Sequence, residues 1–201
     1  MKNSLPKNSH NHSSDVYHLK YKICVSGAAD TAHCAKDALA RAEEMGRLIA
    51  EHNMILITGA TTGVPYWAAK GAKEAGGIVI GLSPAASKAA HVNTYHLPID
   101  YHDLIVYTGF EYAGRNLLLT RSADAVITLC GRMGTLNEFT IAFEDQKPQG
   151  VLLGSGGTTD MLPDIIKNAH RGPGKIVFEK DPRRLLEKLI GLIEAEERDA
   201  K

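Results

Sequence analysis

Short apolar runs alternate with amphipathic stretches from residue 21 almost to the end of the chain. The runs are rich in Val, Ile and Leu, as in strands that are buried on both faces of a sheet. The stretches between them place apolar residues at helical spacing, as Leu39, Met45 and Ile49 show. Because parallel strands need helical crossovers, this alternation predicts an α/β fold: a single Rossmann-like, doubly wound parallel sheet of about seven strands over residues 21–201, with helices on both faces. The predicted strands are 21–26, 54–58, 78–82, 104–108, 125–129, 150–153 and 175–178, and the predicted helices are 35–52, 64–75, 110–122, a segment from about 135 that ends before Pro148, 160–170 and 183–197.

In such a sheet, ligands bind beyond the carboxyl ends of the strands, where the strand order reverses. We expect the strand order 3-2-1-4-5-6-7, with the reversal between the first and fourth strands. The turns after the first, second and fifth strands would then flank one crevice, to which Ser26, Gly27, Thr58 and Gly59 belong. The G-x-G-x-x-G fingerprint is missing after the first strand, so NAD or FAD is disfavoured, and we expect no resident cofactor.

The composition narrows the class of protein. The 201 residues are 44% hydrophobic and 23% charged, as in one globular domain with a core. Lys and Arg together number 23, as do Asp and Glu, so no net charge favours nucleic acid or an anionic membrane. The 3 cysteines show no paired metal-site spacing, and their odd number does not suggest a disulfide framework. Cys24 lies in an apolar run and is expected to be buried. No apolar stretch is long enough to span a bilayer and no signal peptide is evident, so we expect a cytoplasmic protein.

Two segments lack a regular pattern. Residues 1–20 are polar and are expected to form a disordered tail. The loop 83–103 is long enough to be functional or mobile, and it contains His91, His96 and His102. Nothing in their spacing places these histidines on one face, so a metal site is not expected there.

The stretch ADAVITLCGRMGTLNEFTIAFE, residues 123–144, contains the strongest candidate site. A buried strand, a glycine turn and a helix start follow one another in it. The glycines allow close approach to the backbone, and the free N–H groups and positive dipole end of the helix face the same point. We therefore predict that a phosphate or nucleotide contacts this turn, the alternative being an ordinary turn without a ligand. The turn residues are Gly131, Arg132, Met133, Gly134 and Thr135.

The same stretch resembles a known family motif. Residues 129–138, LCGRMGTLNE, are similar to the PGGxGTxxE motif of the LOG-like superfamily, and the segments 25–27, 57–81 and 114–116 support the resemblance. Members with known activity are phosphoribohydrolases, which cleave the N-glycosidic bond of a cytokinin nucleoside 5′-monophosphate and release the base and ribose 5-phosphate. The resemblance implies the Rossmann-like fold, a homo-oligomer and a catalytic pair, Arg115 and Glu138.

These two residue types suit that chemistry. A carboxylate at Glu138 can stabilise an oxocarbenium-like sugar and orient a water molecule. A guanidinium at Arg115 can hold phosphate with two hydrogen bonds. The alternative for Glu138 is that it caps the start of its own helix, as glutamates in the first turn often do.

The chain also departs from the family motif. Cys130 and Arg132 replace the Pro and second Gly, and Tyr112 and Asn116 replace the Met and Lys of the MxxRK segment. These changes resemble the branch that contains the molybdenum cofactor carrier proteins. Two functions therefore stay open: a nucleoside-monophosphate phosphoribohydrolase, or a non-catalytic carrier or sensor of a nucleotide or molybdenum cofactor.

The partner expected in both cases is a small phosphorylated molecule. A DNA-processing relative of the superfamily is disfavoured because the neutral charge balance lacks a basic face, and neither nucleic acid nor a membrane is expected as a partner. Arg132 is expected to reach the phosphate or to pair with a neighbouring carboxylate. The alternative for Arg132 is an arginine exposed to solvent without a role.

Overall fold

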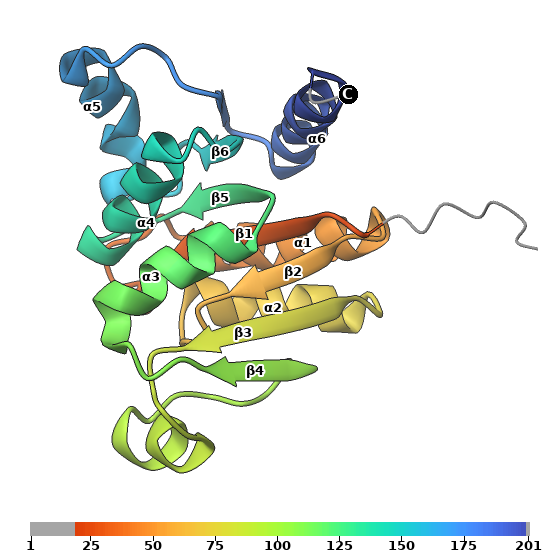
Figure 1. The fold of residues 1–201 in the computed structure, drawn as a ribbon, viewed down its shortest axis with the longest axis vertical. Coiled ribbons are helices and arrows are strands. Elements are labelled where there is room, and N and C mark those ends of the chain that lie inside the picture. Colours follow the sequence, from red (N-terminus) through yellow and green to blue (C-terminus); the bar gives the residue numbers. More distant parts are fainter. Residues whose placement is uncertain (1–18, 200–201) are drawn as a thin grey trace, which may run out of the picture.

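The computed structural model describes residues 19–199, in which a seven-stranded parallel sheet lies between helices (Figure 1). Residues 1–18, where most of the expected disordered tail falls, lie outside the described residues. Every predicted strand is present within one residue of its expected ends, because each is a short apolar run with turn residues on both sides. The strands are β1 (Lys22–Gly27), β2 (Ile55–Thr58), β3 (Ile78–Ser83), β4 (Leu104–Tyr107), β5 (Ala125–Leu129), β6 (Gln149–Leu152) and β7 (Ile176–Glu179).

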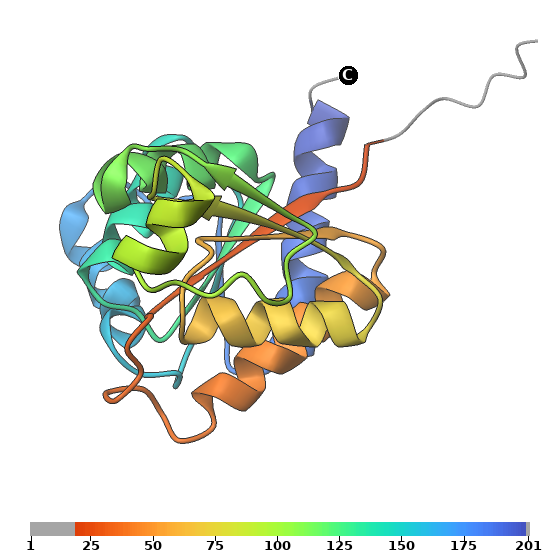
Figure 2. The ribbon, with the colours of Figure 1, turned by 90° about the horizontal axis from the view of Figure 1, so that it is seen from below.

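Helices cover both faces of this sheet, so the predicted α/β fold is confirmed (Figure 2). The first two helices pack together on one face, where the last helix contacts the first, and the third, fourth and fifth lie on the opposite face. Right-handed crossovers produce this division, because the chain changes face when it changes direction across the sheet. The helices are α1 (Ala38–Glu51), α2 (Val64–Glu74), α3 (Glu111–Ser122), α4 (Met133–Glu144), α5 (Leu162–Ala169) and α6 (Pro182–Asp199), with short turns η1 (Ala90–Thr94) and η2 (Thr158–Met161).

The strand order is β4-β3-β2-β1-β5-β6-β7, so the expectation that the fourth strand lies beside the first is wrong. The chain entering β4 is anchored beside β3: the Asp103 carboxylate accepts hydrogen bonds from the Val79 amide at 2.8 Å and from Lys73 Nζ at 2.7 Å. β4 therefore extends the sheet at its edge, with Leu104 opposite Ile80. The reversal of strand order falls between β1 and β5, which places the turns after these two strands side by side.

Three apolar clusters of the described residues sit on the two faces of the sheet. The largest lies under α1 and α2, whose buried side chains include Met45, Leu48 and Ile49. The second lies under α3 and contains Cys24 and Leu119, both almost fully buried, so the expected burial of Cys24 is confirmed. The third and smallest lies between α4, α5 and the sheet. Together the clusters hold the carboxyl ends of β1 and β5 in a rigid frame, because close-packed interiors resist displacement.

Among the histidines of the loop between β3 and β4, His91 and His102 make hydrogen bonds within the fold. His91 is buried, where its Nδ1 lies 2.8 Å from Ser83 Oγ and its Nε2 lies 2.9 Å from the Pro98 carbonyl oxygen. His96 is exposed, and His102 lies elsewhere, against β2. In the described part of the chain, these three histidines do not gather into a metal-binding group.

Candidate functional site

A cavity of about 430 Å³ lies at the carboxyl edge of the sheet, where the ends of β1 and β5 meet the start of α4. Its walls come from the turn after β1, from α3 and from α4. Strand order alone explains this meeting, since the carboxyl ends of neighbouring parallel strands share one edge. The predicted site residues that line the cavity are Gly27, Arg115, Arg132, Gly134, Thr135 and Glu138.

A buried ion pair forms the inner wall of the cavity. Arg115 Nη1, from α3, lies 3.4 Å from Glu138 Oε1, from α4, and both side chains are less than a tenth exposed. Ser26, at the end of β1, donates a hydrogen bond from its hydroxyl to Glu138 Oε2. The structure thus brings together the two predicted catalytic residues and one predicted binding residue, and Glu138 uses its carboxylate for these contacts rather than for capping α4.

Burial dominates the electrostatics of this pair. Removal from water raises the pKa of the Glu138 carboxyl group above its ordinary value, while the Arg115 charge and the Ser26 hydroxyl act in the opposite direction. Arg115 is buried, and its Nε has no hydrogen-bond partner among the described residues. An unpaired buried donor beside a cavity is costly unless a ligand satisfies it.

Gly59 provides the space for this guanidinium. A Cβ atom at position 59 would lie 2.1 Å from Arg115 Nη1, so a larger residue would displace the side chain. Ser26 and Gly59 line a smaller cavity of about 20 Å³ together with the ion pair. Both residues therefore lie next to the ion pair without lining the main cavity.

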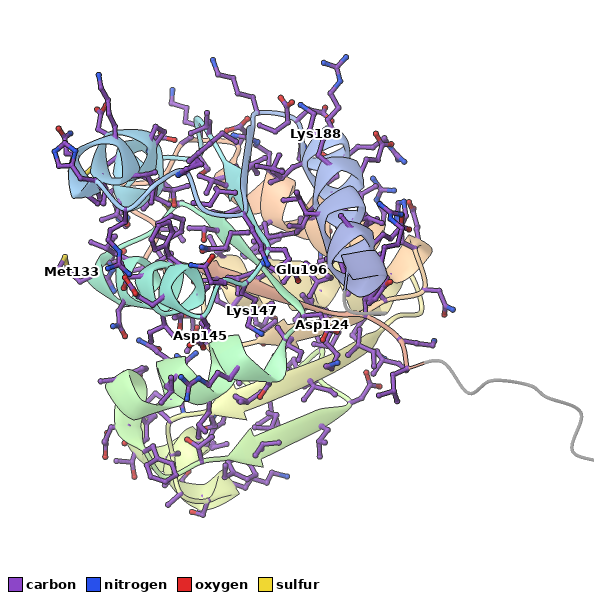
Figure 3. The ribbon with its side chains drawn as sticks, turned by 45° about the horizontal axis from the view of Figure 1, so that its top comes forward. Asp124, Met133, Asp145, Lys147, Lys188 and Glu196 are labelled. Carbon is purple, nitrogen blue, oxygen red and sulfur yellow. A yellow bond between two sulfur atoms is a disulfide. The ribbon has the colours of Figure 1, made fainter. Side chains whose placement is uncertain are left out.

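The start of α4 faces the main cavity without a cap. Arg132 occupies the N-cap position but makes no side-chain cap hydrogen bond, and the first turn contains no acidic residue. The first N–H groups of a helix have no partner within it, and Gly134 and Thr135 carry such groups at the cavity wall. Met133, the first residue of α4, is 73% exposed and points outward from the helix (Figure 3). The turn itself is tightly packed, since a Cβ at Gly131 would lie 2.7 Å from Thr135 Cγ2.

Two further predicted residues have partners of their own. Arg132 Nη1 lies 3.3 Å from Asp30 Oδ2 in an exposed ion pair, so its expected pairing with a neighbouring carboxylate is present. Thr58 lies beside the cavities without lining them: its Oγ1 is 2.9 Å from His102 Nε2 and accepts a hydrogen bond from the Ala60 amide.

The structure also adds site residues that the sequence pattern did not single out. Tyr112 and Asn116 line the cavity from α3, where they were noted only as departures from a motif. Turned so that its nitrogen faces Glu138, the Asn116 amide donates to Oε1 at 2.8 Å. Tyr112 lies three residues before Arg115, on the same side of the helix, and this spacing was the available signal. Asn116 directly follows Arg115, and helical spacing gives no such signal for it.

The expectation that the cysteines form no disulfide is wrong. Cys34, in the loop after β1, is joined to Cys130, directly after β5, with their Cα atoms 5.5 Å apart. An odd number of cysteines carries no information on such a pair, because one residue, Cys24, stays free. The contact follows from the pairing of β1 with β5, which the expected strand order did not include.

Comparisons with known proteins identify the family of this chain. A model of the SLOG cluster4 family matches residues 20–186. The chain belongs to the SLOG cluster4 family. An uncharacterised protein of Archaeoglobus fulgidus is 32% identical over 126 residues, which cover 63% of this chain and 78% of that protein.

Two solved structures resemble this SLOG cluster4 chain over nearly their whole length. The molybdenum cofactor binding protein of Rippkaea orientalis is 30% identical, with a TM-score of 0.72, over 88% of this chain and 99% of that one. The molybdenum cofactor carrier protein of Chlamydomonas reinhardtii is 27% identical, with a TM-score of 0.70, over the same shares. The predicted resemblance to the LOG-like superfamily and its carrier branch is therefore confirmed.

A more distant neighbour bears on nucleic acid as a partner. DNA processing protein A of Helicobacter pylori, described with a single-stranded DNA binding mode, is 18% identical with a TM-score of 0.63, over 85% of this chain and 80% of that one. This likeness shows the shared fold alone. The comparisons thus give no support to the exclusion of nucleic acid that the charge balance suggested. Among the helices of residues 19–199, none has the length and apolar character needed to cross a membrane.

Proposed function

We propose that this SLOG cluster4 protein binds a phosphorylated heterocyclic molecule, of the nucleotide or pterin-phosphate type, and holds it without reacting with it. The supporting observation is that the uncapped start of α4 and the buried guanidinium of Arg115 converge on one cavity. Free N–H groups, the helix dipole and a guanidinium all attract the same anion. The cavity volume, about 430 Å³, lies in the usual range for small-molecule sites.

The surroundings of Glu138 support a carrier rather than an enzyme. Its carboxylate already has Ser26 and Arg115 as partners, and the Asn116 amide can donate to it as well. A carboxylate that stabilises a sugar cation or orients water must instead present a free oxygen to the substrate. The replacement of the family Pro, second Gly and Lys points in the same direction.

The relatives suggest the first ligand to test. The two solved structures at 27% and 30% identity are described as molybdenum cofactor carrier and binding proteins. In this proposal the molybdenum cofactor is cargo, and its phosphate is the group that α4 and Arg115 recognise.

The second candidate function is hydrolysis of a nucleoside 5′-monophosphate. It is favoured by the 3.4 Å contact between Arg115 and Glu138 at the cavity wall, since both residue types are needed for that reaction. Water would add to the anomeric carbon, the N-glycosidic bond would break, and the base would leave with a proton. Ribose 5-phosphate is the other product.

One experiment separates the two functions. The full chain is dialysed against AMP, other nucleoside monophosphates and the molybdenum cofactor, and bound ligand, free base and ribose 5-phosphate are measured. We expect binding without products, lost in Arg115→Met and retained in Arg121→Met, an exposed arginine on the same helix. Release of base by the wild type but not by Glu138→Gln would establish the hydrolase instead. Failure of every phosphorylated ligand to bind would overturn both functions.

A further inference from the structure

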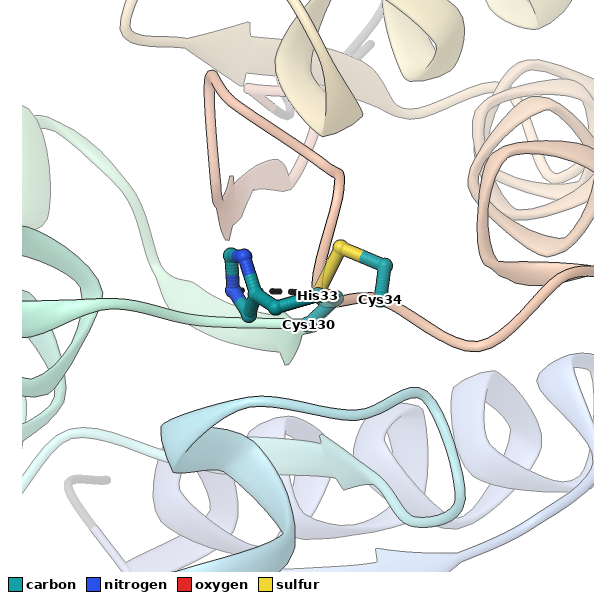
Figure 4. A group of neighbouring side chains, drawn as sticks. All are labelled: His33, Cys34 and Cys130. Carbon is teal, nitrogen blue, oxygen red and sulfur yellow. Dashed lines mark hydrogen bonds between the residues drawn. A yellow bond between two sulfur atoms is a disulfide. The ribbon is translucent and has the colours of Figure 1, made fainter.

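Three side chains with metal-binding atoms meet outside the main cavity. His33 and Cys34 belong to the loop between β1 and α1, and Cys130 directly follows β5 (Figure 4). One ring nitrogen and the two sulfur atoms all lie within 4.8 Å of one another. Cys130 is buried, Cys34 is half-buried and His33 is exposed, so the group is accessible from one side.

Backbone hydrogen bonds hold these residues together independently of the disulfide. The Ala28 amide donates to the Cys130 carbonyl oxygen at 2.7 Å, and the Ala35 amide donates to the Ser155 carbonyl oxygen at 3.0 Å. Ser155 Oγ in turn accepts from the Cys130 amide at 2.9 Å. Ser155 thus holds both the loop that contains Cys34 and the segment that follows β5. For this reason the two sulfur atoms stay close when the disulfide is reduced.

The backbone at Cys130 also indicates a specialised position. Its φ is +26°, in the left-handed region that favours glycine. Strained residues persist where the surrounding structure holds them, and they gather at functional sites. The Cys130 side chain extends from this backbone to the loop after β1, where its sulfur meets Cys34 and His33.

Two thiolates and an imidazole are the ligands that zinc takes in proteins. Bond lengths of about 2.3 Å to sulfur and 2.0–2.1 Å to nitrogen place two ligand atoms of a tetrahedral zinc about 3.5 Å apart. His33 Nε2 lies 3.7 Å from Cys130 Sγ. We propose that, in the reduced protein, His33, Cys34 and Cys130 bind a divalent cation of the zinc class.

The cation can bind only after the disulfide has been reduced. A dithiol reductant transfers two electrons and two protons to the disulfide, which becomes two thiols while the reductant is oxidised to its own disulfide. The cation then displaces the two thiol protons and bonds to two thiolates and the neutral His33 ring. Disulfide and cation exclude each other. Three protein ligands leave a fourth coordination position for water or for an atom of another molecule.

The test uses the full chain, reduced with a dithiol and freed of reductant without oxygen. Co²⁺ serves as a spectroscopic substitute for zinc, and its thiolate charge-transfer absorption is titrated and then reversed by Zn²⁺. We expect one Co²⁺ per chain in the reduced wild type and none in the oxidised protein. Removing one ligand, as in Cys34→Ser or His33→Ala, should weaken binding by at least roughly tenfold.

Cys24→Ser is the matched control and should bind Co²⁺ like the wild type, because the Cys24 thiol is buried in the apolar cluster under α3 and burial raises its pKa. The exposed position of His33 keeps the test valid if a cysteine variant fails to fold. Absence of the absorption band in the reduced wild type, or unchanged affinity in His33→Ala, would overturn the proposal. Neither result depends on the ligand of the main cavity, so the proposed carrier function is tested separately.

Discussion

At the residue scale, the surroundings of the Glu138 carboxyl group shift its pKa. It lies inside the protein beside one guanidinium and one hydroxyl group, and loss of water is the largest influence on its pKa, raising it above 4.5. The folded protein therefore binds this proton more tightly than the unfolded chain does. The contribution of Glu138 to the free energy of unfolding is full below about pH 4.5 and decreases as the pH rises through the folded pKa.

This linkage gives a prediction for Glu138→Gln, whose side chain does not ionise. As the pH rises above about 4.5, the free energy of unfolding of the wild type should fall relative to that of Glu138→Gln. Urea unfolding at a series of pH values measures the difference. Glu144→Gln, an exposed carboxylate on the same helix, is the control and should show a smaller change. If the free energies of unfolding of the wild type and of Glu138→Gln changed with pH in the same way, the raised pKa of Glu138 would be contradicted.

At the scale of elements, two glycines at the start of α4 have different tasks. A Cβ at Gly131 would lie 2.6 Å from Thr158 Oγ1, so this glycine allows the turn to pack against η2. A Cβ at Gly134 would meet no atom within 4 Å, and Gly134 lines the cavity. Gly131 therefore serves the packing of the turn, whereas Gly134 leaves open space at the cavity wall.

Alanine substitutions separate these tasks. Gly131→Ala should lower the free energy of unfolding by about 1–3 kcal/mol, because the added methyl overpacks the turn. Gly134→Ala should leave stability unchanged or raise it by up to about 1 kcal/mol, since alanine favours helix. The same methyl group should weaken AMP binding. Denaturant unfolding and calorimetric titration measure the two effects, and a Gly134→Ala protein that binds AMP like the wild type would show that no ligand approaches this turn.

At the scale of the whole molecule, one face of the sheet edge is apolar and open. Ile80 packs into the cluster under α3, and its neighbour across the strands, Leu104, points to the same side but is 55% exposed. Val106, two residues on, is 44% exposed, and no helix of the described chain lies in front of β4 (Figure 1). Contiguous exposed apolar surface indicates an interaction site.

We expect a second copy of the chain to cover this face, in line with the homo-oligomer that the family resemblance implies. Val106→Lys places a charge on the face and should convert the oligomer to a monomer, measured by light scattering after size-exclusion chromatography. Met161→Lys, at an exposed apolar position on η2, is the control and should keep the wild-type mass. A monomeric wild type, or an unchanged mass for Val106→Lys, would rule this interface out.

The sequence by itself determined the elements of this protein and predicted the central residues of its candidate site. Each strand is a local apolar run and each helix a local periodicity, so both can be recognised without distant contacts. The turn 131–135 and Glu138 were recognisable because one nearly continuous motif contains them, and Arg115 because it lies in a second segment that resembles the family. The start of α1 at Ala38 rather than near 35 is a small exception, and the Ala35 amide before it donates to the Ser155 carbonyl oxygen.

Only the tertiary structure decided how these parts meet. The place of β4 depends on Asp103 bonding to Val79, and the meeting of Cys34 with Cys130 depends on the pairing of β1 with β5. The burial of Glu138 against Ser26 likewise joins residues that are 112 positions apart. Local patterns report the preferences of neighbouring residues along the chain, whereas strand order, the disulfide and the charge environment arise from contacts between distant ones, whose closure the whole packed fold must stabilise.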